Sequence, residues 1–485
     1  MSANAISNNK DAVNPKERML SGAKEYGSLE ERADRGRSAC RACPIDSCGE
    51  LILRDSGESA VALLEEQSAS RIKELIPLRY ERMKSSPFAF FRGAAIVMAS
   101  DLASSPESGL RVQCIGDAHI ANFGVFASPT RHLVFDVNDF DETAPGPWEW
   151  DVKRLAASVE VCARGRGFPK GKRKEIVKAC VKTYRRSMEK YSEMSELDTW
   201  YSHLDVAKTL DRYERESSGS KSGTLHRAIE KAMARDNVRA ADKLAEVVNG
   251  RLRFRHRPPE LVPLSEHHGY DTVEGIELAI EALVGRYFNS LAYDRRWLLR
   301  HYRIEDIAQK VVGVGSVGTR SWVVLLSGKT IKDPLVMQVK EAQQSVVERY
   351  RGESGFPSHG ERVVQGQRLV QSTSDILLGW TSADNPLGEH RDYYVRQLWN
   401  GKGSIDLDTI GAGGLENTAR LCARALAHAH ARTGDSVAIS AYLGTGDGFD
   451  DAMQRFAFAY ADQNQIDYDA FVEAIRDGRL PSQSE

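Results

Sequence analysis

One short segment of the chain brings together a carboxylate, an imidazole and a carboxamide. It reads Gly116-Asp117-Ala118-His119-Ile120-Ala121-Asn122 and follows a short apolar run at residues 111–115. Phosphoryl transfer needs a carboxylate beside the acceptor hydroxyl and an oxygen ligand for the magnesium ion of the nucleotide. Asp117 and Asn122 can supply these two groups from one loop. His119 is a third catalytic candidate, although a histidine on such a loop is also often a structural hydrogen-bonding group.

A second acidic segment follows, with the sequence Phe135-Asp136-Val137-Asn138-Asp139-Phe140-Asp141-Glu142. A strand that ends in several carboxylates suits a hard divalent cation, which prefers oxygen ligands. We expect Asn122 and Asp139 to hold Mg²⁺, with Asp141 and Asp136 as further candidate ligands. Ordinary surface acids after a strand are the alternative interpretation of this segment.

The third motif, Gly313-Val314-Gly315-Ser316-Val317-Gly318, has the spacing G-x-G-x-x-G. A dinucleotide-binding turn with this spacing is followed by a helix, whereas a kinase glycine-rich loop joins two antiparallel strands. Residues 319–326 are rich in β-branched and aromatic side chains, which favours a strand. We therefore expect backbone amides around Gly313, Gly315, Ser316 and Gly318 to cover nucleotide phosphates. A hairpin that binds no ligand is the alternative.

The next strand-like run, residues 335–339, leads directly into Lys340. In kinases a lysine at this point contacts phosphate oxygens and is held by a carboxylate. We expect Glu361 to be that partner, because it opens a helical stretch before the following strand. Glu341, Glu348 and Glu353 are also near in the sequence.

Two further sets of residues complete the expected site. Arg396, Gln397 and Leu398 end the strand-like run DYYVRQL, and we expect them to line the adenine edge of the nucleotide. Arg92 follows an aromatic run in an expected buried helix at residues 86–103. It could pair with Asp151 or reach a phosphate, and we expect the pairing.

These motifs resemble those of the protein-kinase-like superfamily, and most of all its aminoglycoside and choline phosphotransferase branch. GDAHIAN is similar to the H-G-D-x-H-x-x-N loop of that branch, with Cys114-Ile115 in place of the leading histidine region. NDFDETAPGPWEWDVKRLA looks like its metal-binding segment and the helix that follows, which implies that Asp151 braces the catalytic loop. The chain also resembles an uncharacterised bacterial family, domain of unknown function 2252 (DUF2252), through stretches such as SPFAFFRGAA, GVGSVGTR and YYVRQL.

The resemblance implies an α+β fold of the two-lobe kinase type. Because Gly313 and Lys340 come roughly 200 residues after Asp117, the chain order is that of a circular permutation. We expect a mobile arm over residues 1–50 and the catalytic-loop part of a helical lobe over 51–160. A helical insertion on the substrate side follows over 161–305, then a β-rich nucleotide-binding lobe over 306–400 and C-terminal helices over 401–485.

The composition limits the class of protein. The chain has 485 residues, of which 41% are hydrophobic and 28% charged, and a net charge of -2, which is typical of a globular protein with more than one domain. We expect neither a nucleic-acid nor a membrane partner, and a cytoplasmic location, because no apolar run suits a membrane span or a signal peptide. Cys40, Cys43 and Cys48 could hold zinc with a fourth ligand, but such a triplet is more often incidental.

The expected function is that of an ATP- and Mg²⁺-dependent phosphotransferase that acts on a hydroxyl or amine of a small molecule. Transfer of AMP by the same fold, and a nucleotide-binding pseudokinase with a signalling role, stay open as alternatives. The acceptor and the oligomeric state stay open as well.

Overall fold

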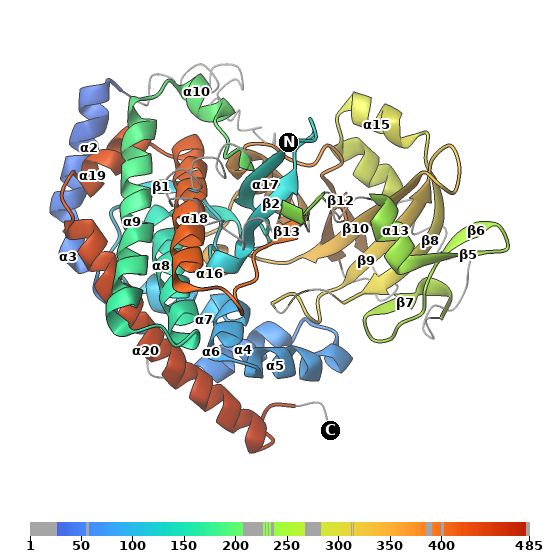
Figure 1. Cartoon of the computed structure of the whole chain (residues 1–485), viewed down its shortest axis with the longest axis horizontal. Helices are drawn as coiled ribbons and strands as arrows, with labels where there is room; N and C mark the ends of the chain where they lie inside the picture. Colours follow the sequence, from blue (N-terminus) through green and yellow to red (C-terminus); the bar gives the residue numbers. More distant parts are fainter. Residues whose placement is uncertain are drawn as a thin grey trace, which may run out of the picture.

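The structure is a computed structural model, and its mixed architecture confirms the α+β part of the expected fold class. Helices occupy one side of the molecule and a large antiparallel sheet the other (Figure 1). The structure describes residues 27–54, 58–206, 227, 229–230, 232–233, 237–266, 283–311, 313, 315–384, 390–398 and 402–481.

The helical side is built on α8 (Trp148–Gly165), which is buried along nearly its whole length. Around it lie α9 (Lys170–Glu193), α18 (Ala412–Thr433) and α20 (Gly448–Arg476), so segments far apart in the sequence are neighbours here (Figure 1). The short helices α10 (Glu196–Tyr201) and α19 (Ser436–Leu443) pack at the edges. The largest apolar cluster fills the space between these helices and the short strands described below.

The N-terminal segment corrects the expectation of a mobile arm over residues 1–50. Helices α2 (Leu29–Ala42) and α3 (Ile45–Cys48) pack on α19 and α20. Ser28 and Glu31 form a capping box that starts α2. Gly36 lies so close to α19 that an added Cβ would be 2.1 Å from the Ala438 carbonyl oxygen. The part of the expected arm at residues 1–26 lies outside the described residues.

The three clustered cysteines serve the packing of this segment. Cys43 and Cys48 are buried, and burial raises the pKa of the Cys48 thiol to about 12. The described residues contain no group of three or more His, Cys, Asp or Glu side chains arranged to hold a metal ion.

A layer of short helices lies beneath the body in Figure 1. It consists of α4 (Ala60–Ser68), the 3-10 turn η1 (Lys73–Leu75), α5 (Ile76–Lys84), α6 (Pro87–Gly93) and α7 (Ala95–Ala103). The single helix expected at residues 86–103 is therefore two. The Ser86 hydroxyl caps α6, and the chain leaves helical geometry at Ala94, with φ -118° and ψ 40°.

Short strands carry the first two motifs between the helical side and the sheet. β1 (Arg111–Cys114) pairs with β4 (Ala144–Pro147), and β2 (Phe123–Ala127) lies between β3 (Leu133–Val137) and β13 (Gly403–Ser404). The 116–122 segment, with the 3-10 turn η2 (Ile120–Asn122), joins β1 to β2, and residues 138–143 join β3 to β4. Cys114 pairs with Ala144 and Phe123 with Val137, so each motif loop begins beside the point where the other ends.

The large sheet has six antiparallel strands in the order β11-β12-β10-β9-β8-β7. These are β7 (Leu261–Pro263), β8 (Arg303–Lys310), β9 (Ser321–Ser327), β10 (Pro334–Ala342), β11 (Gly379–Asp384) and β12 (His390–Gln397). The glycine motif joins β8 to β9, and Lys340 is on β10. Burial alternates strictly along β9, as expected for a strand with one face on a core.

Helices α16 (Val346–Arg351) and α17 (His359–Val370) follow β10 and connect the sheet to the body. Elements from residues 237–299 also belong to the sheet side: α13 (Asn237–Leu244), β5 (Ala245–Val248), β6 (Arg251–Phe254), the 3-10 turn η3 (Leu264–Glu266) and α15 (Tyr293–Leu299). The expected helical insertion over 161–305 is therefore divided. Its first part, with α9, belongs to the body, and its last part extends the sheet lobe.

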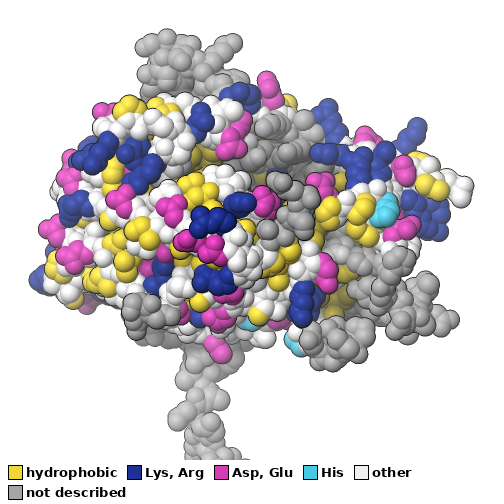
Figure 2. Space-filling model, turned by 90° about the horizontal axis from the view of Figure 1, so that it is seen from below, with side chains coloured by type: hydrophobic (Ala, Val, Ile, Leu, Met, Phe, Trp, Pro, Cys, Tyr) yellow, Lys and Arg dark blue, Asp and Glu magenta, His cyan; other side chains and the backbone are white. Residues whose placement is uncertain are grey.

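The distribution of surface charge and the hydropathy of the helices complete the description. Acidic and basic side chains are interspersed over the helical side of the face in Figure 2. Among the described helices none is both long and apolar enough to cross a membrane.

Candidate functional site

A cavity of about 620 Å³ lies where the two motif loops meet the glycine loop. Eight of the predicted site residues line it: Asp117, His119, Asn122, Asp139, Asp141, Gly313, Gly315 and Ser316. Its other walls come from α4, α6, α7 and the segment after β10. The volume is in the range of small-molecule and cofactor sites. The structure thus brings together motifs that the sequence separates widely.

The backbone around Asp117 is fixed from two sides. Gly116 has a φ of 79°, and an added Cβ would lie 2.1 Å from the Glu142 carbonyl oxygen, so only glycine fits here. Asp151, on α8, accepts the N–H groups of Ile115 at 2.7 Å and Gly116 at 2.9 Å. Asp151 also lies 3.1 Å from Nε2 of His430. The prediction that Asp151 braces this loop is confirmed.

The carboxylate of Asp117 is held in one orientation. Arg154 donates from Nε to Oδ1 at 2.9 Å, and the Asn122 amide donates to the Asp117 carbonyl oxygen at 2.8 Å. Burial raises the pKa of Asp117, although Arg154 and Arg92 oppose the shift. A carboxylate with a raised pKa accepts a proton more readily, which suits a general base.

His119 is buried and neutral. Its Nδ1 accepts the Ala121 N–H at 3.2 Å, so the proton of the neutral ring is on Nε2, which is 3.6 Å from Oδ2 of Asp117. Burial, reinforced by Arg92 and Arg154, places the pKa of His119 well below its usual value. The ring therefore acts as a structural cap of η2 in this arrangement, with its Nε2–H facing Asp117.

Asn122 and Asp139 fit the donor set of a magnesium ion that also binds phosphate. Asn138 N–H donates to the Asn122 carbonyl oxygen at 2.8 Å, which keeps the two loops together. The Asn122 Nδ2 donates a hydrogen bond to the Asp117 carbonyl oxygen, so Oδ1 is the Asn122 atom that is left to bind a cation. Burial and the Asp141 charge raise the pKa of Asp139, a shift that a bound cation would reverse. Mg²⁺ is commonly held by one or two protein oxygens together with phosphates.

Asp141 is the partner of Lys340, and this corrects the expectation that Glu361 would be. The Lys340 ammonium contacts Asp141 Oδ2, the Tyr394 hydroxyl donates to Oδ1 at 2.7 Å, and Ser316 Oγ lies 3.4 Å from Oδ2. Three donors therefore approach the Asp141 carboxylate, and its role as a further Mg²⁺ ligand stays a prediction. Glu361 sits in the first turn of α17, where its N–H donates to Ser358, and does not line the cavity.

The environment of Lys340 keeps it charged. Burial alone would lower the pKa of this lysine, but the carboxylates of Asp139 and Asp141 outweigh burial and raise the pKa. Lys340 is therefore a fixed cation behind Asp141, which lines the cavity, whereas Lys340 itself is not among the lining residues.

The glycine loop is docked on the layer of short helices. Arg82 donates to the Gly313 carbonyl oxygen at 2.6 Å, Arg71 to that of Val317 at 2.5 Å, and the Ile72 N–H to that of Gly318 at 2.8 Å. Gly313 and Gly318 have φ values of 69° and 90°, which explains why glycine stands at both positions.

The residues expected at the adenine edge are engaged elsewhere. Gln397 binds Asp375 through Nε2 at 2.5 Å, and Leu398 is buried in the apolar cluster beside the sheet. Arg396 donates to Gln338 at 3.2 Å and to the Asn138 carbonyl oxygen at 3.4 Å. None of these three residues lines the cavity, and Gly318 does not line it either.

Sequence reasoning missed two functional neighbours and misplaced a third. Arg154 could have been found, because it lies three residues after Asp151 and therefore near the same face of the helix. Tyr394 gave no such signal, since its contact with Asp141 spans 253 residues. Arg92 does not pair with Asp151, whose oxygens are taken by backbone N–H groups and His430; it lines the cavity instead.

Comparison with known proteins gives a family and nothing closer. No curated protein and no solved structure matches the chain. One family model matches residues 71–474, a span that contains every site residue described above. The chain therefore belongs to the family described as an uncharacterized protein conserved in bacteria (DUF2252).

Proposed function

We propose that this protein is an ATP- and Mg²⁺-dependent phosphotransferase of the kinase type that acts on a hydroxyl or amine of a small molecule. The observation that carries the proposal is the ion pair between Lys340 and Asp141. It joins residues 199 positions apart and brings a lysine-bearing strand beside the loop of Asp117 and Asn122. A phosphotransferase needs these groups around one cavity.

The acceptor side of the reaction would depend on Asp117. Its Oδ1 is held by Arg154, and its raised pKa makes it a better proton acceptor at neutral pH. In this role Asp117 orients the acceptor hydroxyl and takes its proton as the bond to phosphorus forms. His119, buried and neutral, keeps the loop in shape and faces the same carboxylate.

The nucleotide side would depend on Lys340 and the glycine loop. Backbone amides around Gly315 and Ser316 would cover the phosphates, and Lys340 would exchange Asp141 for phosphate oxygens. Asn122 and Asp139 would hold Mg²⁺, which neutralises negative charge on the nucleotide when bound. Because Lys340 is already charged and desolvated, little reorganisation is needed to receive an anion.

The connectivity of the sheet lobe also supports the kinase type. The glycine loop joins two antiparallel strands, β8 and β9, and the next strand, β10, carries the lysine. Kinases have this arrangement. The chain order, with the catalytic loop first, then corresponds to a circular permutation.

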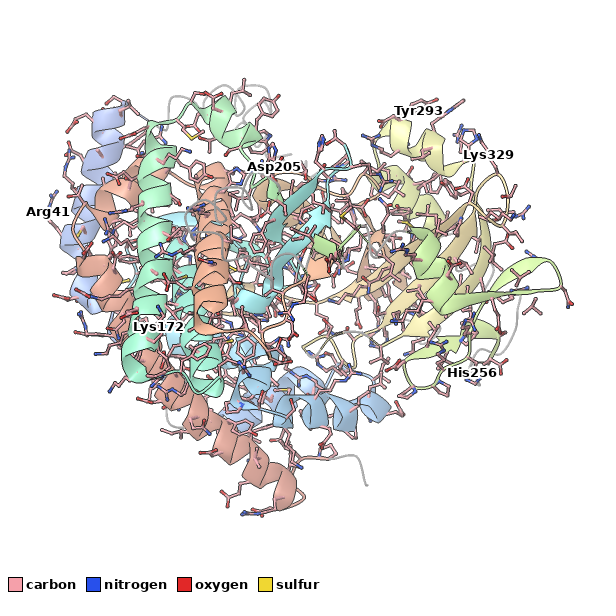
Figure 3. All side chains as sticks on the ribbon, in the orientation of Figure 1. Arg41, Lys172, Asp205, His256, Tyr293 and Lys329 are labelled. Carbon is pink, nitrogen blue, oxygen red and sulfur yellow. The ribbon has the colours of Figure 1, made fainter. Side chains whose placement is uncertain are left out.

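Nucleotide-induced stabilisation tests the proposal. Thermal unfolding is followed with Mg²⁺ alone and with Mg²⁺ and ATP, for the wild type, Lys340→Ala and Asp139→Ala. ATP at 100 times its Kd should stabilise the wild type by about 2.7 kcal/mol. Both variants should lose this shift, and Lys329→Ala, a lysine in the exposed turn after β9, should keep it (Figure 3).

The product distinguishes the related activities. Incubation with ATP and candidate acceptors, followed by mass measurement, separates a transferred phosphate from a transferred AMP. Binding without any turnover would identify a pseudokinase. A wild type that ATP does not stabilise would overturn the nucleotide assignment and the activity with it.

A further inference from the structure

Arg92 is a half-buried cation in the cavity wall, and no described residue forms an ion pair with it. It ends α6, and its side chain lines the cavity together with Asp117 and Asp139. Its Nε is shielded from solvent and has no hydrogen-bond partner, and the described part of the chain gives the guanidinium no ion pair. A guanidinium is always charged and carries five donors, so leaving the shielded Nε of Arg92 without a hydrogen bond costs free energy.

The other arginines of the cavity are engaged. Arg349 forms a bidentate salt bridge with Glu66, with N–O distances of 2.8 and 2.9 Å. Arg391 binds Glu341 at 2.8 Å, and Arg71 donates to the Val317 carbonyl oxygen. In the described part of the chain, Arg92 is thus the cavity arginine whose hydrogen-bonding capacity is left for a ligand.

The acids near Arg92 do not take up this capacity. The charges of Asp117, Asp408 and Asp139 partly offset the burial that lowers the pKa of Arg92, so all three are close enough to interact. Asp117, however, already accepts from Arg154 at 2.9 Å. The position of Arg92 beside this carboxylate is therefore not explained by a structural ion pair.

The glycine loop lies against the same residue. An added Cβ on Gly315 would be 3.4 Å from the Arg92 carbonyl oxygen, so the loop passes directly over the end of α6. Arg92 is placed between the loop of Asp117 on one side and the glycine loop on the other. Its planar fork matches two oxygens of a tetrahedral oxyanion.

We propose that Arg92 is the main ligand of an oxyanion-binding site in this cavity, one that takes a phosphate group. The group could come from two sources, the terminal phosphoryl group of a nucleotide or a phosphate that the acceptor molecule carries itself. The site is defined by Arg92 and its surroundings alone, so it stands or falls separately from the phosphotransferase activity.

Binding of inorganic phosphate tests the site. Thermal shifts are titrated with sodium phosphate against sodium chloride of equal ionic strength, for the wild type, Arg92→Gln, Arg92→Lys and Arg349→Gln. Loss of hydrogen bonds to a charged group predicts roughly ten- to a hundredfold weaker phosphate binding in Arg92→Gln. Arg92→Lys, which keeps the charge without the fork, should be intermediate, and Arg349→Gln should bind like the wild type.

The controls make the outcome decisive. Without phosphate, Arg92→Gln should melt no lower than the wild type, because the substitution removes a half-buried charge that has no ion pair in the described part of the chain. Equal phosphate affinity in the wild type and Arg92→Gln, or an equal loss in Arg349→Gln, overturns the site. So does a wild type that phosphate stabilises no more than chloride.

A second titration identifies the source of the group. The phosphate titration is repeated in the presence of Mg²⁺ and a saturating concentration of a non-hydrolysable β,γ-imido analogue of ATP. Displacement of phosphate assigns Arg92 to the terminal phosphoryl group, and continued binding assigns it to a phosphate on the acceptor. If the analogue does not bind at all, the proposed activity fails while the phosphate titration still decides the role of Arg92.

Discussion

Breaking the ion pair between Lys340 and Asp141 should cost about 2–3 kcal/mol of folding free energy. Removing one member of a buried pair usually costs about 3–5 kcal/mol, because the other charge is left without compensation. The Lys340 side chain is 3% exposed and that of Asp141 is 28% exposed, so water compensates Asp141 in part. The Tyr394 hydroxyl also remains on Asp141, at 2.7 Å. Both effects place the cost of Lys340→Met at or just below the lower limit of the usual range.

A double-mutant cycle measures the pair itself. Urea unfolding is compared for the wild type, Lys340→Met, Asp141→Asn and the double variant. The double variant should recover about 1–2 kcal/mol relative to the sum of the single changes, because it leaves no unpaired charge from this pair. Lys329→Met, on the exposed turn, should change stability by less than about 0.5 kcal/mol. Single changes that add within about 0.5 kcal/mol would refute the pairing.

Two further predictions concern the loop of Asp117 and the acid next to the Lys340 pair. Gly116→Ala should destabilise the protein by at least about 2 kcal/mol in urea unfolding, since the new Cβ meets the Glu142 carbonyl oxygen at 2.1 Å with φ at 79°. Gly165→Ala, where a Cβ meets nothing within 4 Å, is the control, and equal effects would contradict the reasoning. Burial raises the pKa of Glu142 from 4.5 to about 7, so the folded state binds an extra proton between these values and stability falls as pH rises through this window. Glu142→Gln should flatten that decline in unfolding measurements between pH 4.5 and 8, and an unchanged pH profile would contradict the shift.

The local parts of the site could be predicted from the sequence. Asp117 and Asn122 are close in the chain, so their loop brings them together whatever the rest of the fold does. The β9–β10 hairpin could be predicted as well, because β-branched and aromatic residues at 322–326 and the turn at 327–329 are local features of the sequence. These predictions rest on short-range geometry, which the sequence specifies directly.

The partner of Lys340 could not be predicted in the same way. Four glutamates lie near Lys340 in the sequence, and Glu361 has the expected position on a helix. The choice is made by packing between segments 199 residues apart, which places Asp141 under β10. No local pattern carries this information.

The N-terminal helices show a different limit. The Ser28 and Glu31 capping box is visible in the sequence, but α2 buries few of its residues. The position of α2 is fixed by the hydrogen bond from Arg32 to Asp435 at 2.9 Å and by the close approach of Gly36 to Ala438. Because these contacts come from residues far away in the sequence, the polar composition of α2 alone predicts a mobile arm.

The two acid-bearing loops of the cavity are hydrogen-bonded to each other and braced by different helices. Glu142 accepts the Val346 N–H at 2.7 Å, and Arg362 donates to the Asp141 carbonyl oxygen at 2.9 Å, so the acidic loop is fastened to α16 and α17. The loop of Asp117 is fastened instead to α8, through Asp151 and Arg154.

A ligand that contacts both Asp117 and Lys340 would therefore reach two loops that different helices brace. The order of the motifs along the chain has no bearing on this, because each loop is held by contacts across the fold. Because the two loops are also hydrogen-bonded to each other, Asp117 and Asp141 keep a fixed separation around the cavity.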